Sequence, residues 1–494
     1  MYFVIYDFET TGRSSRFDQI LQAGLICFDS SLKEIQRLNL RSRINPDIVP
    51  SLGALKVNKL LMTDLLEEKN SSYEMMRDLN DFLNHYKPSI FLGYNSIHFD
   101  EEFLRQSLWE FFKYPYITST KENCRGDVFN LATMTHAFDS NAVNVDKNND
   151  GKMSFKLESL ASINNIKIDN AHEAISDVLA TKKVLEIIKN SSPKLFSNFL
   201  ENTKVKKIGE KIKTSEFFTY YGYYFNKHYI YLLTQLLDHP TYNNYILAFD
   251  LKFDPEEIIN LEYNELVSVY YEKKLNGKSF NCFKKIKLNK QPAVLDFNYS
   301  INRSPYNEIG LEELKKRKDK IKNEEFLGNF KKILITESEN YETNYEFEEE
   351  TIYSEGINFS DKIIMEDFDK VEWEKKWDFA SKFKDPRLLF FAARHIYRNT
   401  PEFLPNNIFR RVHQKISERF NSMKKEKFTT IPSAMEEADT LSAEIEEGGE
   451  RVFIIKQLEQ YNIYINFLNS YYNDINAKPL KFDNDLSKKL FYQN

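Results

Sequence analysis

Short runs of aliphatic and aromatic residues alternate with longer amphipathic segments over the first part of the chain. The pattern predicts strands at residues 2–8, 20–29, 35–43 and 90–94, helices at 73–85, 100–112, 127–138, 157–163 and 172–190, and a polar loop at 143–152. Strands that alternate with helices of this length indicate an α/β domain. We therefore expect the chain to begin with a sheet covered by helices.

The pattern changes near residue 200. A basic stretch at residues 204–213 is predicted to be a linker, and segments rich in Tyr, Phe and Val, such as 245–250 and 266–271, predict a small, mainly β domain. This domain would contain one helical insert near residues 311–326, and the acidic residues 346–350 are predicted to form a solvated loop.

From about residue 367 the chain is predicted to be helical. Apolar residues recur there at spacings of 4, 3, 4 and 3, which places them on one helix face: Ile454, Leu458, Tyr461, Ile465 and Leu468. We expect three domains, at residues 1–196, 197–357 and 358–494.

Composition agrees with several folded domains, since the 494 residues are 41% hydrophobic. The net charge of −6 does not attract nucleic acid to the chain as a whole, but it leaves room for a local basic groove. Cys27, Cys124 and Cys282 show no paired spacing, which indicates a reducing compartment and no structural zinc site. No signal peptide or membrane-spanning run is evident, so we expect a soluble cytoplasmic protein with no membrane partner.

Four carboxylates and a histidine in the first 180 residues carry the candidate chemistry. Asp7 and Glu9 are two apart on a predicted strand and share a face, whereas Asp100 stands at a junction of strand and helix. His172 and Asp177 follow later. Carboxylates bind Mg²⁺, which prefers oxygen ligands, and a histidine suits a general base at neutral pH. Together they are what two divalent ions and a water need to hydrolyse a phosphodiester.

Each residue also has a structural alternative. Asp7 and Glu9 could belong to a polar edge strand that runs into the Thr-Thr-Gly turn, and Asp100 could be a helix N-cap worth about 1 kcal/mol. His172 and Asp177 would diverge by roughly 140° on a continuous helix, so they share a site only if His172 precedes the helix. Otherwise His172 is a surface residue.

The five positions together, with Phe-Lys-Leu-Glu-Ser-Leu-Ala at residues 155–161, resemble the DEDDh 3′→5′ exonucleases, which have an RNase H-like fold. The resemblance implies that Asp7, Glu9, Asp100 and Asp177 hold two Mg²⁺ ions, with Mn²⁺ as a substitute. It also implies that His172 is the general base.

Further motifs look like bacterial exonuclease I. They lie at residues 93–95, 99–102, 114–116 and 149–155, then at 239–240, 288–292 and 353–356, and finally at 383–388 and 398–402. This resemblance implies a central Src-homology-3-like domain and a C-terminal helical domain. It also implies degradation of single-stranded DNA from its 3′ end to 5′-mononucleotides, in DNA repair and recombination.

The same resemblance implies substrate contacts at Glu9, Lys156, Arg105 and Tyr116. Lys156 stands where the family has an arginine, so it keeps the charge but loses the bidentate fork. Arg105 would pair with phosphate and Tyr116 would stack on a base, although they could instead be a solvated helix residue and a core residue. Lysines 204, 206, 207, 211 and 213, or 284, 285, 287 and 290, would line the DNA groove or form a solvated surface.

Two departures from the family affect the expected partners. Thr11 replaces an aromatic residue, which would change contacts to the terminal base. The loop at 139–145 lacks a basic residue associated with docking the single-stranded-DNA-binding protein. We still consider that protein as a partner, and we expect the enzyme to be a monomer. Two other functions remain open: an RNA 3′-exonuclease of the same superfamily, and a non-catalytic scaffold that binds single strands.

Overall fold

The structure is a computed structural model that describes residues 1–148, 151–168, 173–340, 344–443 and 451–492. Within these ranges, no helix combines the length and the apolar character needed to cross a membrane. His172, the expected general base, lies outside the described residues.

A five-stranded mixed sheet forms the centre of the N-terminal domain, in the order β3-β2-β1-β4-β5. Its strands are β1 (Tyr2–Thr10), β2 (Ile20–Phe28), β3 (Glu34–Arg41), β4 (Ser89–Gly93) and β5 (Cys124–Asp127). β1 pairs antiparallel with β2 and parallel with β4, so it is the central strand. This arrangement confirms the α/β domain that the alternating pattern predicts.

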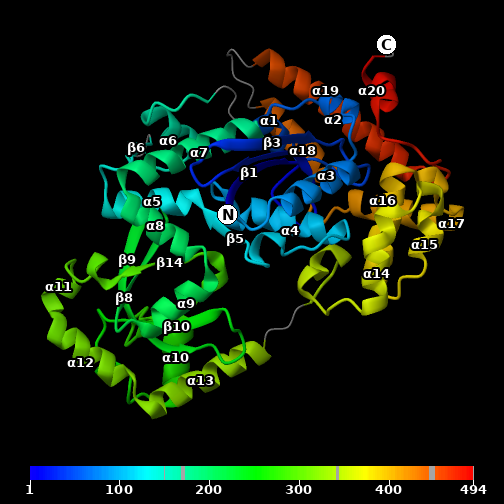
Figure 1. The fold of residues 1–494 in the computed structure, drawn as a ribbon. Helices are drawn as coiled ribbons and strands as arrows, with labels where there is room; N and C mark the ends of the chain where they lie inside the picture. Colours follow the sequence, from blue (N-terminus) through cyan, green and yellow to red (C-terminus); the bar gives the residue numbers. More distant parts are fainter. Residues whose placement is uncertain (149–150, 169–172, 341–343, 444–450, 493–494) are drawn as a thin grey trace.

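Helices cover both faces of this sheet (Figure 1). The helices of this domain are α1 (Leu52–Asn58), α2 (Met62–Glu67), α3 (Ser72–His85), α4 (Asp100–Glu110), α5 (Val128–Phe138), α6 (Leu157–Ile163), α7 (Ala174–Ser191) and α8 (Pro193–Asn202). Residues of α3 and α4 share one core with the sheet, whereas residues of α5, α7 and α8 share the core on the other face. The loop expected at 143–152 contains the short strand β6 (Asp146–Lys147), which pairs antiparallel with β7 (Met153–Ser154) just beyond the loop.

Alternation along β1 decides which core each side chain enters. Val4, Tyr6 and Phe8 pack with the α3–α4 core, and Phe3 and Ile5 pack with the core that contains α7. Asp7 and Glu9 continue the Phe3–Ile5 series, so they face the side of the sheet that α7 covers. A single strand therefore supplies both the domain core and the first two candidate ligands.

A second domain contains an antiparallel sheet in the order β13-β10-β9-β8-β14. Its strands are β8 (Phe218–Tyr224), β9 (Lys227–Asp238), β10 (Tyr245–Asp250), β13 (Phe283–Lys287) and β14 (Ala293–Asp296), with a small hairpin of β11 (Lys274–Leu275) and β12 (Lys278–Ser279). Helices α10 (Tyr263–Glu272), α11 (Tyr306–Ile309), α12 (Leu311–Ile321) and α13 (Glu324–Glu339) accompany it. The expected single insert near 311–326 is thus larger, since α13 continues to Glu339.

Two predictions in this region were wrong. The expected linker at 204–213 is a helix, α9 (Val205–Thr214), because Ile208 and Ile212, four apart, are buried against the β sheet. The expected strand at 266–271 belongs to α10, whose Leu266 and Val269 enter the core of the β domain. In both cases tertiary packing of one helix face outweighed the local composition.

The C-terminal part is helical, as predicted. It contains α14 (Phe359–Asp367), α15 (Lys376–Ala380), α16 (Pro386–Asn399), α17 (Asn406–Phe420), α18 (Ile431–Ala443), α19 (Arg451–Asn473) and α20 (Asn484–Phe491). The five spaced residues of α19 share one core, with Ile454 at its edge, so their predicted common face is confirmed. That core also takes in Leu52 and Leu55 of α1, so the C-terminal helices fold onto the N-terminal domain.

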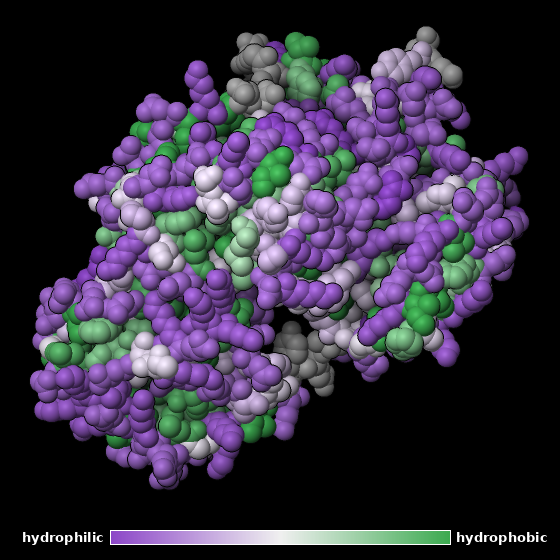
Figure 2. All heavy atoms as spheres, viewed as in Figure 1, coloured by the Kyte–Doolittle hydropathy of each residue, from purple (hydrophilic) through white to green (hydrophobic). Residues whose placement is uncertain are grey.

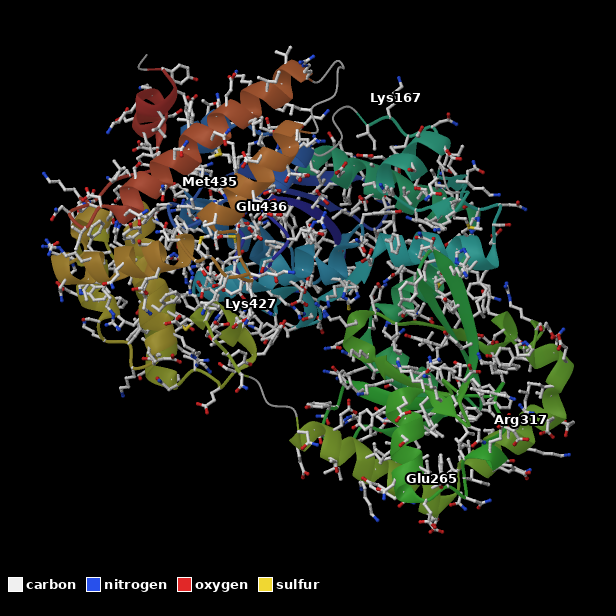
Figure 3. The ribbon with its side chains drawn as sticks, turned by 180° about the vertical axis from the view of Figure 1, so that it is seen from behind. Lys167, Glu265, Arg317, Lys427, Met435 and Glu436 are labelled. Carbon is white, nitrogen blue, oxygen red and sulfur yellow. The ribbon has the colours of Figure 1, made fainter. Side chains whose placement is uncertain are left out.

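The β domain and the C-terminal helices lie on different sides of the molecule. The surface is hollowed between them (Figure 2). The view from behind shows the same separation, with Glu265 and Arg317 in the β domain and Lys427, Met435 and Glu436 at the C-terminal part (Figure 3). Both parts are joined to the N-terminal domain. We call the β domain (β8 to α13) and the C-terminal helices (α14 to α20) the two walls beside the N-terminal domain.

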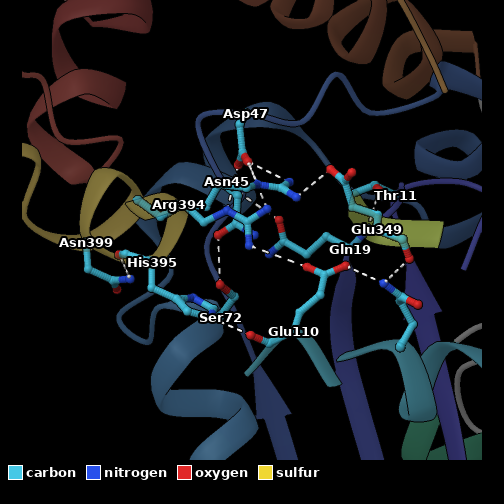
Figure 4. A network of polar contacts seen from close by, with 12 residues as sticks. Thr11, Gln19, Asn45, Asp47, Ser72, Glu110, Glu349, Arg394, His395 and Asn399 are labelled. Atoms are coloured by element: carbon cyan, nitrogen blue, oxygen red, sulfur yellow. Dashed lines mark hydrogen bonds and ion pairs between the residues drawn. The ribbon is translucent and has the colours of Figure 1, made fainter. Parts of the chain in front are cut away.

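A buried ionic network fixes the C-terminal helices to the N-terminal domain (Figure 4). Arg394 of α16 bonds Asp47 at 2.7 Å and Glu349 at 2.6 Å. Arg398 also bonds Asp47 at 2.7 Å, and Arg419 of α17 bonds Glu349 at 2.6 Å. The acidic residues 346–350, predicted to be a solvated loop, therefore include a carboxylate that is only 1% exposed, and that prediction was wrong for Glu349.

The network sets the ionisation of both acids. Burial alone would raise the pKa of Asp47, but Arg394 and Arg398 hold that pKa below its usual value. The pKa of Glu349 is likewise lowered by Arg394 and Arg419 against the effect of burial. A depressed pKa means that the stabilisation is fully present above the ordinary carboxyl pKa, near 4, and is lost as the pH falls below it.

We expect Asp47→Ala to lower the free energy of unfolding by about 3–5 kcal/mol at pH 7, because it leaves two buried arginines without their shared carboxylate. Chemical denaturation would measure the loss, and the difference between variant and parent should shrink as the pH falls below about 4. Glu34→Ala, which removes an exposed pair with Arg37, is the control and should cost less than about 1 kcal/mol. Equal losses in the two variants would contradict the assigned role of the network.

Candidate active site

Three carboxylates meet at the end of β1. Asp7, Glu9 and Asp177 each offer an oxygen, and these oxygens lie within 4.8 Å of one another. Asp7 and Glu9 come from the strand, and Asp177 from the first turn of α7. Within the described part of the chain, no other group of histidine, cysteine or acidic side chains meets the same condition.

The close approach of α7 to the sheet depends on Gly24. Gly24 lies on β2 directly opposite Asp7, and a Cβ at this position would be 2.7 Å from the backbone carbon of Ala174. Only a residue without a side chain lets the helix start so near the strand. Because α7 begins at Ala174, its first turn brings Asp177 to Asp7 and Glu9.

Asp100 reaches the same strand from α4. Its carboxylate accepts a hydrogen bond of 3.0 Å from the backbone amide of Phe8, the residue between Asp7 and Glu9. The alternative role as the N-cap of its own helix is not what the structure shows, because Phe99 holds the cap position and Asp100 is the first helical residue. Asp100 is 4% exposed, so its charge is buried beside the cluster.

Asp127 holds the turn that leads to Asp100, and the sequence analysis missed it. Its carboxylate accepts hydrogen bonds from the backbone amides of Asn95 at 2.8 Å and Ile97 at 3.2 Å, and it also caps α5 through Phe129. Asn95 adopts a left-handed conformation with φ of 58°. The single-sequence signal was an aspartate at a strand end before a helix, which suggests only a cap.

Glu101 anchors the start of α4 in a second network that sequence alone did not reveal. It is fully buried and bonds Arg125 at 2.6 Å, Arg105 at 3.0 Å and Thr118 at 2.6 Å, and it accepts a 2.8 Å hydrogen bond from Tyr6 on β1. Burial raises the pKa of Glu101, but the two arginines reverse this and hold it below its usual value. The residue after Asp100 is therefore a fixed anion.

The pKa values of Asp7, Glu9 and Asp100 are shifted in the opposite direction, above their usual values. Burial raises the pKa of Glu9 to about 8, and the charges of Asp177 and Asp100 add to the shift. Burial also raises the pKa of Asp100 to about 8 despite its bond to Phe8, and it raises the pKa of Asp7 well above the usual value. Like charges held close together in a half-buried site favour the binding of protons or cations.

The donor set suits a hard divalent cation. It consists of carboxylate oxygens of half-buried side chains whose charges raise one another's pKa, and Arg41 only partly offsets this effect at Glu9. The described residues therefore fit a metal site of oxygen ligands.

The expected DNA contacts lie in different environments. Lys156 is exposed at the start of α6. Arg105 is only 7% exposed and is paired with Glu101, and its guanidinium lies 5.4 Å from the centre of the half-buried Tyr116 ring. The solvated-helix alternative for Arg105 therefore fails, while phosphate pairing by Arg105 and base stacking by Tyr116 stay predictions.

Thr11 is held within its own loop. It is fully buried, donates a 3.0 Å hydrogen bond to Asp18 and accepts one of 2.9 Å from the backbone amide of Gln19. Its side chain supports the turn between β1 and β2.

Comparison with known proteins divides the chain into three matched segments. Residues 4–185 match the exonuclease family, residues 206–332 the exonuclease I SH3-like domain, and residues 348–465 the exonuclease I C-terminal domain. The exodeoxyribonuclease I of Haemophilus influenzae is 26% identical over 487 residues, which cover 93% of this chain and 98% of that protein. That of Buchnera aphidicola subsp. Acyrthosiphon pisum is 29% identical, with 79% of this chain and 96% of that protein covered.

Solved structures confirm the fold. Exonuclease I from Methylocaldum szegediense superposes with a TM-score of 0.82 at 21% identity, covering 95% of this chain and 99% of that one. Escherichia coli exonuclease I in complex with a dT13 oligonucleotide gives 0.80 at 21% identity, covering 94% and 99%. With an exonuclease, an SH3-like and a C-terminal segment in this order along one chain, the protein belongs to the exonuclease I family.

Proposed function

We propose that this protein is a 3′→5′ exodeoxyribonuclease that degrades single-stranded DNA to 5′-mononucleotides with two Mg²⁺ ions. The observation that supports the proposal most directly is the cluster of Asp7, Glu9 and Asp177 within 4.8 Å, with Asp100 bonded to the same strand. The relatives bear the name exodeoxyribonuclease I, and one structural neighbour holds a DNA oligonucleotide.

In this proposal the chain's own groups divide the work. Asp7, Glu9, Asp100 and Asp177 hold the metal ions, and His172 takes the proton of the attacking water. When bound, the two ions would supply an activated water and stabilise the leaving 3′ oxygen. Glu101 and Asp127 position Asp100 through the contacts described above and touch no substrate.

The substrate strand needs groups that hold phosphates and bases without reading sequence. Lys156 is an exposed cation at the start of α6, and we assign it a phosphate contact. Tyr116 offers one ring face to a base, while Arg105 occupies the other as a positioning group.

Mn²⁺ would substitute for Mg²⁺, since both prefer oxygen ligands.

Asp177→Ala is expected to lower the rate of nucleotide release by at least about 10³-fold, because it removes a ligand that stabilises transition-state charge. The variant should keep or slightly raise its melting temperature without metal, since one repelling charge is gone. Turnover of labelled DNA and thermal unfolding would measure the two effects, and Glu186→Ala on the same helix is the control. A large fall in melting temperature would instead make Asp177 a structural residue.

Mg²⁺ binding should release protons at pH 7, because Glu9 and Asp100 have pKa values of about 8 without metal and must ionise to bind it. Raised pKa values also mean that the metal-free protein loses stability as the pH rises from about 4 through 8, and Mg²⁺ should restore it. Calorimetry in buffers of different ionisation enthalpy would count the protons, which should fall towards zero above pH 9. Buffer-independent heats at pH 7 would contradict the shifted ionisation.

Direction and substrate can be tested together with 5′-labelled single-stranded DNA, the same strand blocked at its 3′ end, and an RNA copy. We expect shortening of the free-ended DNA alone, and none with EDTA or with Asp177→Ala. Faster cleavage of RNA would point to an RNA 3′-exonuclease, because the 2′-hydroxyl distinguishes the two polymers. Binding without cleavage would point to a non-catalytic scaffold.

A further inference from the structure

The β domain meets the N-terminal domain through a short loop between β13 and β14. Residues 288–291 form this loop, which consists of a short 3₁₀ helix (Leu288–Lys290) followed by Gln291. Leu288 is 6% exposed and packs in the core that Ile208 and Ile212 of α9 also enter, so the loop is anchored in its own domain. We call residues 288–291 the docking loop.

Two residues of the docking loop reach groups around the start of α4. The backbone carbonyl of Asn289 accepts a 2.6 Å hydrogen bond from Arg125, whose guanidinium also bonds Glu101 at 2.6 Å. The ammonium of Lys290 donates a 2.8 Å hydrogen bond to Glu102. Glu101 and Glu102 directly follow the metal ligand expected on α4, so both contacts support the same turn of helix.

Gln291 makes the third contact, and it does so inside the protein. Its side-chain carbonyl accepts a 2.8 Å hydrogen bond from the backbone amide of Asp127, and the residue is 6% exposed. A Cβ at Gly126 would be 3.0 Å from the amide nitrogen of Gln291, so the two backbones approach closely. Gln291 also has a left-handed backbone with φ of 49°, a conformation that costs free energy outside glycine and persists where the surroundings fix it.

This third contact continues to Asp100 through Asp127. The carboxylate of Asp127 accepts hydrogen bonds from the backbone amides of Asn95 and Ile97, in the turn that leads into α4. Asp100 is the first residue of that helix, and its carboxylate reaches β1. A shift of Asp127 would therefore move the turn and the carboxylate together. Groups that orient metal ligands in this way influence metal affinity without touching the metal.

We propose that the docking loop of the β domain positions Asp100 in the active site, with Gln291 as the positioning residue. A contact that only joined the two domains could end anywhere on their surfaces. All three contacts of the loop instead end on groups that support the chain just before or just after Asp100. The inference rests on the proposed function, because it takes Asp100 as a metal ligand, and its test separates the two.

The test replaces Gln291 by Met, which is similar in size but lacks the carbonyl acceptor. Because both side chains are uncharged, the change does not alter the electrostatic attraction of Mg²⁺ to the carboxylates. We expect Gln291→Met to bind Mg²⁺ at least about threefold more weakly than the parent in calorimetry without DNA, less than the 10–100-fold typical of groups that bond a ligand directly. Gln235→Ala, which removes a 2.9 Å hydrogen bond to Asp238 within the β domain, is the control and should bind as the parent does.

Kinetics distinguish positioning from a general loss of structure. The Mg²⁺ concentration that gives half the maximal cleavage rate should rise by the same factor in Gln291→Met, with the KM for single-stranded DNA unchanged. A partly folded variant would instead lose rate at every Mg²⁺ concentration and keep the same half-saturation point. Gln291→Gly also lacks the acceptor but suits the left-handed backbone, so it should show the same shift even if the Met variant folds poorly. Circular dichroism would compare the folding of the variants.

Equal Mg²⁺ affinity of the parent and of both Gln291 variants would overturn the proposal and leave the docking loop as a contact between domains. A raised KM for DNA with unchanged Mg²⁺ affinity would also overturn it, because the loop would then act on the substrate. If the parent binds Mg²⁺ but cleaves neither DNA nor RNA, the proposed function fails, whereas the calorimetric comparison still decides the role of Gln291.

Discussion

Burying several carboxylates at one end of β1 is the constraint on which the rest of the structure depends. Like charges held close together in a partly buried site repel one another, and binding of protons or cations relieves the repulsion. The ligands stay together because rigid elements leave them no freedom to separate. Gly24 brings the first turn of α7 against the sheet, and Asp127 fixes the turn before Asp100. The crowded carboxylates therefore lower the stability of the metal-free fold, and the same arrangement places them ready to bind a metal ion.

The other two parts of the chain are tied to the same short segment. Glu102, two residues after Asp100, accepts a 2.8 Å bond from Lys290 of the β domain and a 3.1 Å hydrogen bond from the Tyr353 hydroxyl, which precedes the C-terminal helices. Arg16, from the loop after β1, lies 3.9 Å from the same carboxylate. One turn of α4 therefore carries a candidate metal ligand and joins all three parts. A movement of either wall beside the sheet would be transmitted to the start of this helix.

The sequence predicted the α/β domain well because its strands and helices follow local periodicity, and Asp7, Glu9 and Asp177 were brought together as expected. It failed where distant residues decide the structure. The stretch with Ile208 looked like a linker because its many lysines hide two core positions, and Glu349 looked solvated because its partners, Arg394 and Arg419, lie more than forty residues away. Asp127 and Glu101 went unnoticed for the same reason, since their importance lies in contacts that a single sequence does not show.

The network around Glu101 also changes how the chain can hold a polyanion. Arg105 is expected to contact phosphate, but it is buried and shares the single carboxylate of Glu101 with Arg125, and the whole chain carries a net charge of −6. In the proposed function, exposed lysines such as Lys156 would therefore supply the attraction for DNA, and stacking on aromatic faces such as that of Tyr116 would supply much of the binding free energy. Stacking is nearly independent of base identity, so a strand held in this way can shift by one nucleotide with little change in free energy. An exonuclease that removes nucleotides in succession needs similar binding free energies at neighbouring positions of the strand more than it needs tight binding at any one position.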